Sequence, residues 1–232
     1  MTERTPTGAT PTIVQRLRQI PLFTQLDDGE LERIGRAARD KNYPKGSVIL
    51  FEDDPGDALY VVLSGQVKVV LIGEDGREVI LSMLKVGDFF GEMSLIDDQP
   101  RSAHVIAVDD AGLLVLRRDD FRACLEESPR IALGLLQALS RRLRRADDKI
   151  GGLVLLDVNG RVARLLLELA DEHDGQTIPR KVTHHTIAQM IGSSRETVSR
   201  TIRDLADKGF IRVSRKDIAI LQRAPLEDLA GL

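Results

Sequence analysis

Residues 186–200 have the sequence TIAQMIGSSRETVSR. Apolar residues recur at helical spacing on both sides of Gly192, which is typical of two short helices joined by a tight turn. Ser194 stands where the hydroxyl of an N-cap residue would begin the second helix. The stretch therefore predicts a helix-turn-helix, with helices over residues 185–191 and 196–208.

The second predicted helix carries polar side chains three or four positions apart, which places them on one outward face. Arginine can donate two hydrogen bonds to guanine O6 and N7, and glutamate can accept one from cytosine N4. A carboxylate such as Glu196 is unfavourable beside phosphates unless it meets a base donor, so we favour DNA readout over a solvated charged face. The candidate DNA-binding residues are Ser194, Arg195, Glu196, Thr197, Ser199, Arg200 and Arg203.

Short apolar runs at residues 210–213 and 218–221 follow the helix-turn-helix, and an amphipathic helix over residues 161–172 precedes it. Two β-runs directly after the second helix predict a wing. We therefore expect residues 158–232 to form a winged helix-turn-helix whose partner is double-stranded DNA.

The charge distribution supports this division of the chain. The 232 residues carry 33 basic and 36 acidic side chains, a net charge of −3 that argues against a nucleic-acid partner. However, residues 1–128 contain 15 basic and 23 acidic side chains, whereas residues 176–216 contain nine basic and three acidic ones. The acidity lies in the first half, and the basic segment coincides with the predicted helix-turn-helix, as contact with DNA phosphates requires.

The first half of the chain contains short apolar runs separated by glycine-containing turns. Runs at this regular spacing predict an antiparallel sandwich or barrel, here a jelly roll, whose interior can hold one small ligand. Amphipathic helices over residues 13–20 and 28–39 precede the runs. The runs are residues 48–51, 59–63, 67–71, 78–84, 104–108 and 112–116.

A long helix is expected after Ser128, which offers a cap hydroxyl immediately before Pro129 at the first helical position. Apolar or small residues then recur at spacings of three and four, between charged flanks, as in a heptad pattern. We favour a coiled-coil homodimer about this helix; the alternative is that the helix packs on its own sheet. The stripe comprises Leu136, Leu139, Leu143, Ala146, Ile150 and Leu153.

The segment FFGEMSLIDDQPRSA, residues 89–103, has the composition of an anion cradle. Gly91 lets backbone N–H groups approach a phosphate, Arg101 supplies a forked donor and Ser102 adds a hydroxyl. Glu92 would repel a bare phosphate and needs a donor such as a ribose hydroxyl, so the segment predicts a nucleotide site. The alternative is an ion pair between Glu92 and Arg101 that only closes a loop.

Together these patterns predict an α+β protein in three segments. Residues 13–128 form the jelly-roll effector domain, residues 129–157 the dimerisation helix and residues 158–232 the winged helix-turn-helix.

Other classes of protein find little support. The single cysteine, Cys124, and the absence of metal-ligand spacing among four histidines argue against a metal, haem or iron–sulfur site. The sequence has no nucleophile–base arrangement and no triphosphate-binding loop, so we expect no enzyme. No apolar run reaches the roughly 18 residues of a membrane span, and residues 1–12 do not read as a secretion signal, so we expect a cytoplasmic protein without a membrane partner.

The sequence SRETVSR at the start of the second helix resembles the recognition helix of the CRP/FNR superfamily, the transcriptional regulators related to the cyclic-AMP receptor protein and the fumarate–nitrate regulator. Arg195, Glu196 and Arg200 match base-reading residues of the first branch. Ser199 also fits the second branch. The resemblance spans residues 13–223 and implies a homodimer that reads palindromic TGTGA-like half-sites and, if it activates transcription, contacts RNA polymerase.

Residues 89–103 resemble the phosphate-binding cassette of cyclic-nucleotide-binding domains. On the dimer helix, Ala146 and Asp147 stand where the cyclic-AMP receptor protein has a threonine–serine pair that contacts adenine. The resemblance implies a cyclic-nucleotide effector, with cAMP expected first. Asp147 could accept from adenine or equally pair with guanine, so cGMP or cyclic di-GMP stays open, as does a solvent-facing Asp147 with no ligand role. The motif positions are matched by Gly91, Glu92, Arg101 and Ser102, and pocket-lining positions by Met93, Ser94, Leu95 and Ala103.

Two further hypotheses stay open. One is a regulator of the same class that works without a ligand and whose cassette is vestigial. The other is a nucleotide-sensing regulatory subunit that controls a partner protein instead of DNA.

Overall fold

A computed structural model describes residues 13–179, 182–215 and 217–232. The chain divides into two compact units, the first built from residues up to 69 and 83–141, the second from residues 70–82 and from 142 onward. Residues 1–12, which do not read as a secretion signal, lie outside the described residues, as do Arg180, Lys181 and Lys216 of the basic segment. The expected boundaries of the three segments stay predictions.

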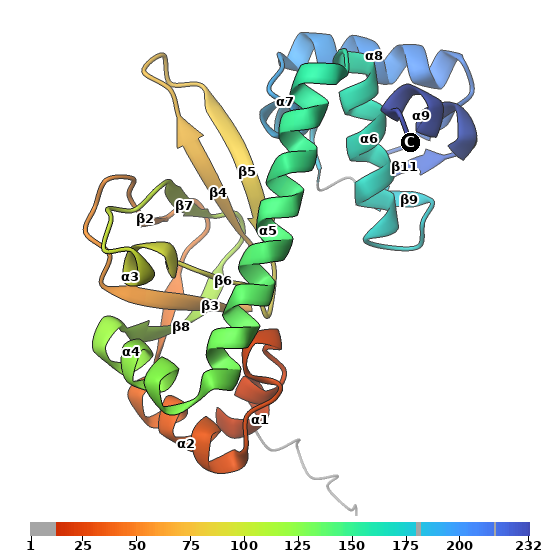
Figure 1. The fold of residues 1–232 in the computed structure, drawn as a ribbon. Coiled ribbons are helices and arrows are strands. Elements are labelled where there is room, and N and C mark those ends of the chain that lie inside the picture. Colours follow the sequence, from red (N-terminus) through yellow and green to blue (C-terminus); the bar gives the residue numbers. More distant parts are fainter. Residues whose placement is uncertain (1–12, 180–181, 216) are drawn as a thin grey trace, which may run out of the picture. The chain divides into compact units, whose positions relative to one another are not determined.

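Eight strands form two four-stranded sheets in the order of a jelly roll, so the predicted β architecture is confirmed (Figure 1). All six apolar runs named above become strands. The first sheet has the order β1 (Arg39–Tyr43), β8 (Ala111–Arg117), β3 (Ala58–Ser64), β6 (Phe89–Phe90). The second has the order β2 (Val48–Leu50), β7 (His104–Ala107), β4 (Val67–Ile72), β5 (Glu78–Leu84).

Strand β3 is buried along most of its length because it lies inside the first sheet, between β8 and β6. Its antiparallel register with β8 places Val61 opposite Leu114 and Val62 opposite Leu113. These four side chains are at most 1% exposed. A strand that is buried on both faces reads as a continuous apolar run, which is why ALYVVL stands out in the sequence.

Strand β1 was not predicted, and the helix expected over residues 28–39 ends earlier, as α2 (Asp28–Ala37). The sequence of β1, RDKNY, has no apolar alternation and is almost fully exposed. Backbone pairing with β8 at the edge of the sheet defines this strand. Charged residues are common on edge strands, where they oppose pairing with other chains.

Helices cover one side of the first sheet (Figure 1). Their apolar faces form a core with the roll around Phe23, Phe121 and Ile131, which are at most 2% exposed. Asp27 starts α2 with a capping box, because its side chain accepts from the Glu30 amide and the Glu30 side chain accepts from the Asp27 amide. Besides α2, the helices are α1 (Ile13–Arg18), η1 (Pro21–Phe23), α3 (Met93–Ile96) and α4 (Arg118–Glu127).

The long helix α5 spans Pro129–Leu155 and continues through Gly151 and Gly152, where the sequence contains its first strong helix-breaking signal. The expected cap is wrong in one respect. Ser128 ends α4, and its hydroxyl is buried without a hydrogen-bond partner among the described residues. None of the helices in the described ranges is both long and apolar enough to cross a lipid bilayer.

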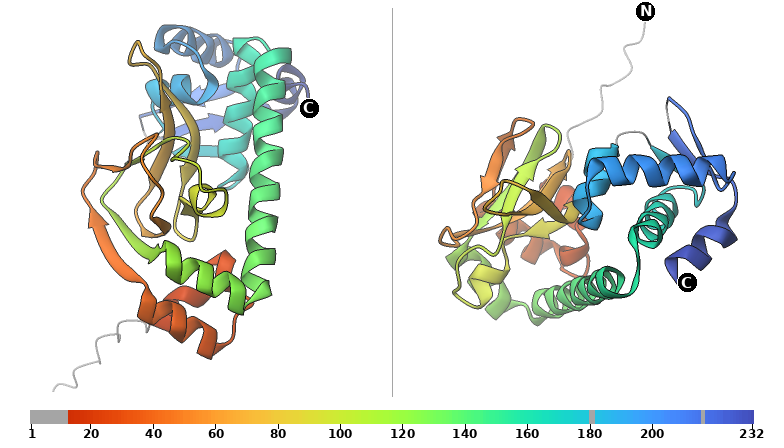
Figure 2. Two further views of the ribbon diagram at one scale, coloured as in Figure 1. Left: turned by 60° about the vertical axis from the view of Figure 1, so that its left-hand side comes forward. Right: turned by 90° about the horizontal axis from the view of Figure 1, so that it is seen from above.

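The second unit contains a winged helix-turn-helix, as predicted. Its helices α6, α7 and α8 lie together in every view (Figures 1 and 2) around buried Leu166, Ile187 and Val198. An additional C-terminal helix, α9, was not predicted. The elements are α6 (Val158–Asp171), β9 (Thr177–Pro179), α7 (His184–Ile191), α8 (Arg195–Asp207), β10 (Ile211–Val213), β11 (Asp217–Ile220) and α9 (Arg223–Ala230).

Helix α9 packs on α6 through Leu226, which is fully buried. Arg223 fastens its start, because the guanidinium donates to both carboxylate oxygens of Asp171 at 2.7 and 2.8 Å. Pro225 falls in the first turn, where a missing N–H costs no helical hydrogen bond. A proline near a helix start obscures the amphipathic pattern, so the sequence suggested no helix here.

Candidate ligand cassette and DNA-reading helix

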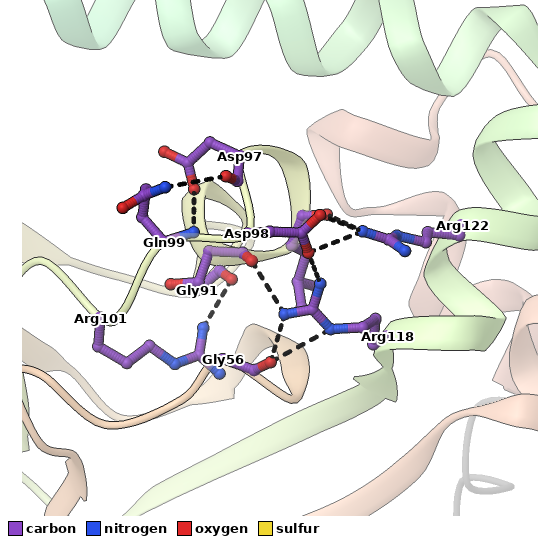
Figure 3. Close-up of polar contacts among 10 residues, drawn as sticks. Gly56, Gly91, Asp97, Asp98, Gln99, Arg101, Arg118 and Arg122 are labelled. Atoms are coloured by element: carbon purple, nitrogen blue, oxygen red, sulfur yellow. Dashed lines mark hydrogen bonds and ion pairs between the residues drawn. The ribbon is translucent and has the colours of Figure 1, made fainter.

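Arg101 lies at the centre of the predicted cassette and is only 3% exposed. Its Nη1 donates to the Gly91 carbonyl at 2.7 Å (Figure 3), and its Nη2 donates to the Ala58 carbonyl at 3.0 Å. Nη2 also lies 3.3 Å from Oδ1 of Asp57, a carboxylate that is 73% exposed. A buried cation is therefore held by two neutral carbonyls and one peripheral acid.

Two glycines allow the backbone to approach this guanidinium. Gly91 has φ +84°, and a Cβ added there would lie 2.7 Å from Arg101 Nη1 and 2.9 Å from the Ala58 carbonyl oxygen. A Cβ on Gly56 would lie 2.3 Å from Cβ of Ser94. Any larger residue at either position would displace the arginine or the helix beside it.

The structure brings the predicted cassette residues together at the turn from β6 into α3 and at the start of β7. Glu92, Ser94 and Ala103 are 1%, 2% and 6% exposed. Met93 and Ser102 are exposed and approach each other, with Ser102 Oγ 3.9 Å from Met93 Sδ. Helix α3 itself has four residues, so it supplies position more than a helix dipole.

The cassette has the chemistry of an anion site. Arg101 Nε is buried and has no hydrogen-bond partner among the residues that the structure describes. An uncompensated buried donor on a cation is unfavourable, and an anionic oxygen would satisfy it. The residues present therefore fit a phosphate group.

An aromatic pair forms one wall beside Arg101. Tyr60 stacks on Phe90 with ring centroids 5.1 Å apart, and Arg101 Cζ lies 6.0 Å from the Tyr60 centroid. Burial, with a smaller contribution from the negative charge of Asp57, raises the pKa of the Tyr60 hydroxyl to about 12, against a partial lowering by Arg101. Tyr60 thus stays neutral at any physiological pH.

Ala146 and Asp147, the two candidates on the dimer helix, are exposed on α5 and belong to the second unit, whereas the cassette belongs to the first. Their predicted contact with a ligand stays a prediction.

Helix α8 begins with the predicted cap. Ser194 Oγ accepts from the Thr197 amide at 3.1 Å and lies 3.0 Å from Thr197 Oγ1. The inner face of the helix is buried through Val198, Ile202 and Leu205. One cap and one apolar face fix both where the helix starts and which side faces outward.

The outer face of α8 presents the predicted base-reading residues together. The charged members of this set are exposed, and Ser199 is half-buried. The residues that line one surface hollow on this face are Arg195, Glu196, Ser199, Arg200 and Arg203. Three guanidinium groups beside one carboxylate and one hydroxyl supply the donors and acceptors that base edges require.

Sequence reasoning missed four residues that shape the cassette. Gly56 and Asp57 come from the loop before β3, Asp98 from the turn after α3 and Arg118 from the start of α4. Figure 3 labels Gly56, Asp98 and Arg118. Gly56, Asp57 and Arg118 lie outside residues 89–103, and Asp98 lies inside this segment but is not one of the matched motif positions. No local pattern therefore points to them. The left-handed backbone of Asp98, with φ +56°, is itself invisible in the sequence.

Comparison with known proteins agrees with this geometry. Residues 40–128 match the cyclic nucleotide-binding domain family, and residues 160–229 match the Crp-like helix-turn-helix domain family. The chain is 38% identical over 210 residues to the cyclic AMP receptor protein of Thermus thermophilus, covering 90% of this chain and 96% of the relative. The chain belongs to the CRP/FNR family of transcriptional regulators.

Two further proteins show how far the similarity extends. The CRP-like cAMP-activated global transcriptional regulator of Mycobacterium tuberculosis is 33% identical over 209 residues, covering 88% of this chain and 93% of the relative. The c-di-GMP responsive global regulator CLP of Xanthomonas campestris has a similar structure, with a TM-score of 0.74, 26% identity and coverage of 84% of this chain and 99% of that chain.

Membership of the CRP/FNR family establishes the general class of the protein. It is a CRP-like transcription regulator with a cyclic nucleotide-binding domain and a helix-turn-helix domain, and the family consists of regulators, not enzymes. Regulators of this family bind DNA, typically as dimers. The described residues contain no group of three or more His, Cys, Asp or Glu side chains that could hold a metal ion.

Proposed function

We propose that this CRP/FNR regulator binds a cyclic nucleotide in the residue 89–103 cassette and, as a homodimer, reads palindromic TGTGA-like sites under the control of that ligand. The observation that carries the proposal is the buried Arg101, whose Nε has no hydrogen-bond partner among the described residues. A cation in this position is explained most simply by an anionic ligand that completes its hydrogen bonding.

Different cassette residues would bind different groups of the ligand. Arg101 and the backbone at Gly91 would hold the phosphate, and Ser102 would add a hydroxyl donor. Glu92 would accept from the ribose hydroxyl, because a carboxylate beside a phosphate needs such a donor. The ligand supplies the negative charge and the base, and the protein supplies their orientation.

We propose cAMP as the first candidate for the ligand, because the relatives from Mycobacterium tuberculosis and Thermus thermophilus are named for cAMP. The structural neighbour from Xanthomonas campestris responds to c-di-GMP, so cGMP and cyclic di-GMP are the alternatives. Asp147 could accept from the amino group of adenine or from the N1 and N2 donors of guanine. The presence of an aspartate at position 147 therefore favours neither adenine nor guanine.

The homodimer is proposed from the apolar stripe on α5. Leu136, Leu143 and Ile150 are 64%, 64% and 59% exposed in the single chain, which is unusual for side chains of this size in a regular heptad pattern. Leu139, in the same stripe, is instead half-buried against the core of the first unit. A second copy of α5 would cover the exposed members and bring two α8 helices to adjacent half-sites. Contact with RNA polymerase is the corresponding proposal if the protein activates transcription.

The test is a fluorescence-anisotropy titration of a palindromic duplex with TGTGA half-sites, with and without cAMP, cGMP or cyclic di-GMP. We expect one of the three nucleotides to raise the affinity for DNA about tenfold or more. Arg200→Ala should abolish preference for this duplex over a scrambled one. The matched control Lys208→Ala removes an exposed basic residue at the end of the same helix and should weaken binding to both duplexes equally.

The other hypotheses give different results. Equal DNA affinity with and without every nucleotide, together with no heat of nucleotide binding in calorimetry, would identify a ligand-independent regulator. Nucleotide binding without preference for any palindromic duplex would support a regulatory subunit of a protein partner.

A further inference from the structure

Arg118, at the start of α4, lies outside residues 89–103. Its side chain nevertheless holds together three segments in and beside the cassette. Its Nε and Nη2 donate to the Gly56 carbonyl at 3.2 and 2.6 Å, and Nη2 also donates to the Ser94 carbonyl at 3.0 Å (Figure 3). Nη1 donates to Oδ1 of Asp98. One guanidinium thus binds the loop before β3, helix α3 and the turn that follows it.

The backbone of the same residue adds a fourth contact. The Arg118 amide donates to the Asp57 carbonyl at 2.8 Å. Arg118 is 26% exposed, so these contacts are partly shielded from water and stronger than those of a surface ion pair. The loop containing Gly56 and Asp57 is therefore fixed by Arg118 through two successive carbonyls.

Asp98 provides the anion that orients Arg118. Its carboxylate also accepts from Arg122 Nη2, at 2.9 and 3.1 Å, so α4 holds the turn after α3 with two arginines. Both hydrogen bonding to Arg118 and the charge of Arg122 hold the pKa of this carboxyl below its usual value. Asp98 adopts φ +56°, a conformation that costs free energy for a residue with a side chain.

The segments held in this way touch the ligand-binding arginine. A Cβ on Gly56 would lie 2.3 Å from Ser94 Cβ and 3.5 Å from Arg101 Cζ, so Gly56 is packed between α3 and that guanidinium. Any shift of Gly56 or Ser94 would move the surface against which Arg101 rests. The donors of Arg118 are themselves occupied by Gly56, Ser94 and Asp98.

We propose that Arg118, oriented by Asp98, is a positioning residue of the nucleotide site: it sets the placement of Gly56 and Ser94 against Arg101, and so determines how the cassette presents donors to the ligand phosphate. This inference rests on the proposed binding of a cyclic nucleotide.

The experiment compares Arg118→Met with Arg117→Met in the full-length protein. Arg117 is the matched control, because it is the adjacent arginine, is exposed and makes no side-chain hydrogen bond at the N-cap of α4. Calorimetry measures affinity for the Rp and Sp phosphorothioate forms of cAMP, which differ only in which exocyclic oxygen is replaced by sulfur. We expect Arg118→Met to lower both affinities about tenfold or more and to change their ratio, whereas Arg117→Met changes neither.

The affinity ratio separates positioning from folding, because loss of folded protein lowers both affinities by one factor. Arg118→Lys keeps the charge but cannot donate to two carbonyls as a fork, so it should recover part of the affinity and little of the ratio. Amide hydrogen exchange without ligand should be faster at residues 95–97 in Arg118→Met than in Arg117→Met. An unchanged ratio together with unchanged exchange would overturn the proposal.

A second variant covers the case in which Arg118→Met does not fold. Asp98→Asn removes the anion but retains a residue that tolerates the left-handed conformation. It should raise exchange at residues 95–97 and shift the Rp/Sp ratio in the same direction; a wild-type ratio would contradict the inference. If the wild type binds no cyclic nucleotide, the proposed function fails, and the exchange comparison still decides whether Arg118 positions the cassette.

Discussion

At the scale of single residues, burial is the main influence on the pKa of the Tyr60 hydroxyl, and neighbouring charges modify it. The ring is 7% exposed, it stacks on Phe90 and it lies beside the Arg101 guanidinium. Burial raises the pKa of its hydroxyl to about 12, and Asp57 contributes in the same direction. The unfolded chain releases this proton near the ordinary value of 10.0. The folded state thus holds the proton more tightly than the unfolded state between these two values.

This difference gives a prediction for alkaline pH. The stabilisation associated with neutral Tyr60 is complete below pH 10 and is lost as the pH rises through about 12. The chain has two tyrosines and no tryptophan, so absorbance at 295 nm reports tyrosinate cleanly. We expect a titration phase near pH 12 that is absent in Tyr60→Phe.

Urea unfolding of Tyr60→Phe and of the wild type gives a second test. Between pH 10 and pH 12, the free energy of unfolding should fall less in Tyr60→Phe than in the wild type, since phenylalanine has no proton to lose. Both proteins should retain their circular dichroism over this range during the absorbance titration. A wild-type titration that is complete below pH 11 in the folded protein would show that Tyr60 is not shielded.

At the scale of elements, helix α5 carries an apolar stripe whose side chains are partly left exposed by the single chain. Leu143 and Ile150 are exposed at equivalent positions of successive heptads, although they are among the most apolar side chains of the helix. Burying such side chains stabilises by about 1.5–3 kcal/mol each, which is the driving force expected for pairing with a second α5.

The dimer prediction is tested by Leu143→Glu. A carboxylate from each copy would meet within the apolar seam, and two like charges in a desolvated interface are strongly unfavourable. We expect the mass measured by sedimentation equilibrium to fall from that of a dimer to that of one 25.7 kDa chain. The substitution should leave the helix content unchanged.

Leu155→Glu is the matched control for this experiment. Leu155 is 81% exposed on the same helix but lies two positions after the last residue of the stripe, away from the seam. The variant should remain a dimer. A monomeric wild type, or equal masses for both glutamate variants, would contradict pairing through the stripe.

At the scale of the whole molecule, ligand binding and DNA binding are expected to be coupled through one equilibrium. A ligand can shift that equilibrium only by as much as its affinities for the two states differ. Coupling is reciprocal, and the proposed dimer has two nucleotide sites. The factor by which filling both sites raises DNA affinity must therefore equal the product of the factors by which DNA raises nucleotide affinity at the two sites.

This reciprocity is a quantitative prediction. Nucleotide is titrated calorimetrically into the free regulator and into the regulator bound to saturating palindromic DNA. The product of the two site affinities should be about tenfold or more higher in the DNA-bound regulator. The scrambled duplex is the control and should leave nucleotide affinity nearly unchanged. If the factor for DNA affinity and the product for nucleotide affinity differ beyond error at equal salt, the sites are not linked by a single two-state equilibrium.

The sequence predicted those elements whose residues carry their own signal. The Ser194 cap and the apolar spacing around Val198 located α8 to within one residue at each end. Strands β1 and β6 were missed because two phenylalanines, or a charged edge segment, have no period to detect. Their existence depends on backbone pairing with β8 and β3, partners that the local sequence does not reveal.

The candidate sites divide in the same way. The sequence alone determined the chemical types, an arginine and a glycine in one short cassette and a basic face on one helix, because motif residues lie close together along the chain. Only the tertiary structure decided that Arg101 is buried beside Gly56, and that Arg118 and Asp98 hold the surrounding segments. The reason is that burial and long-range hydrogen bonds arise when distant segments pack, and no periodicity within one segment encodes which distant residue it will meet.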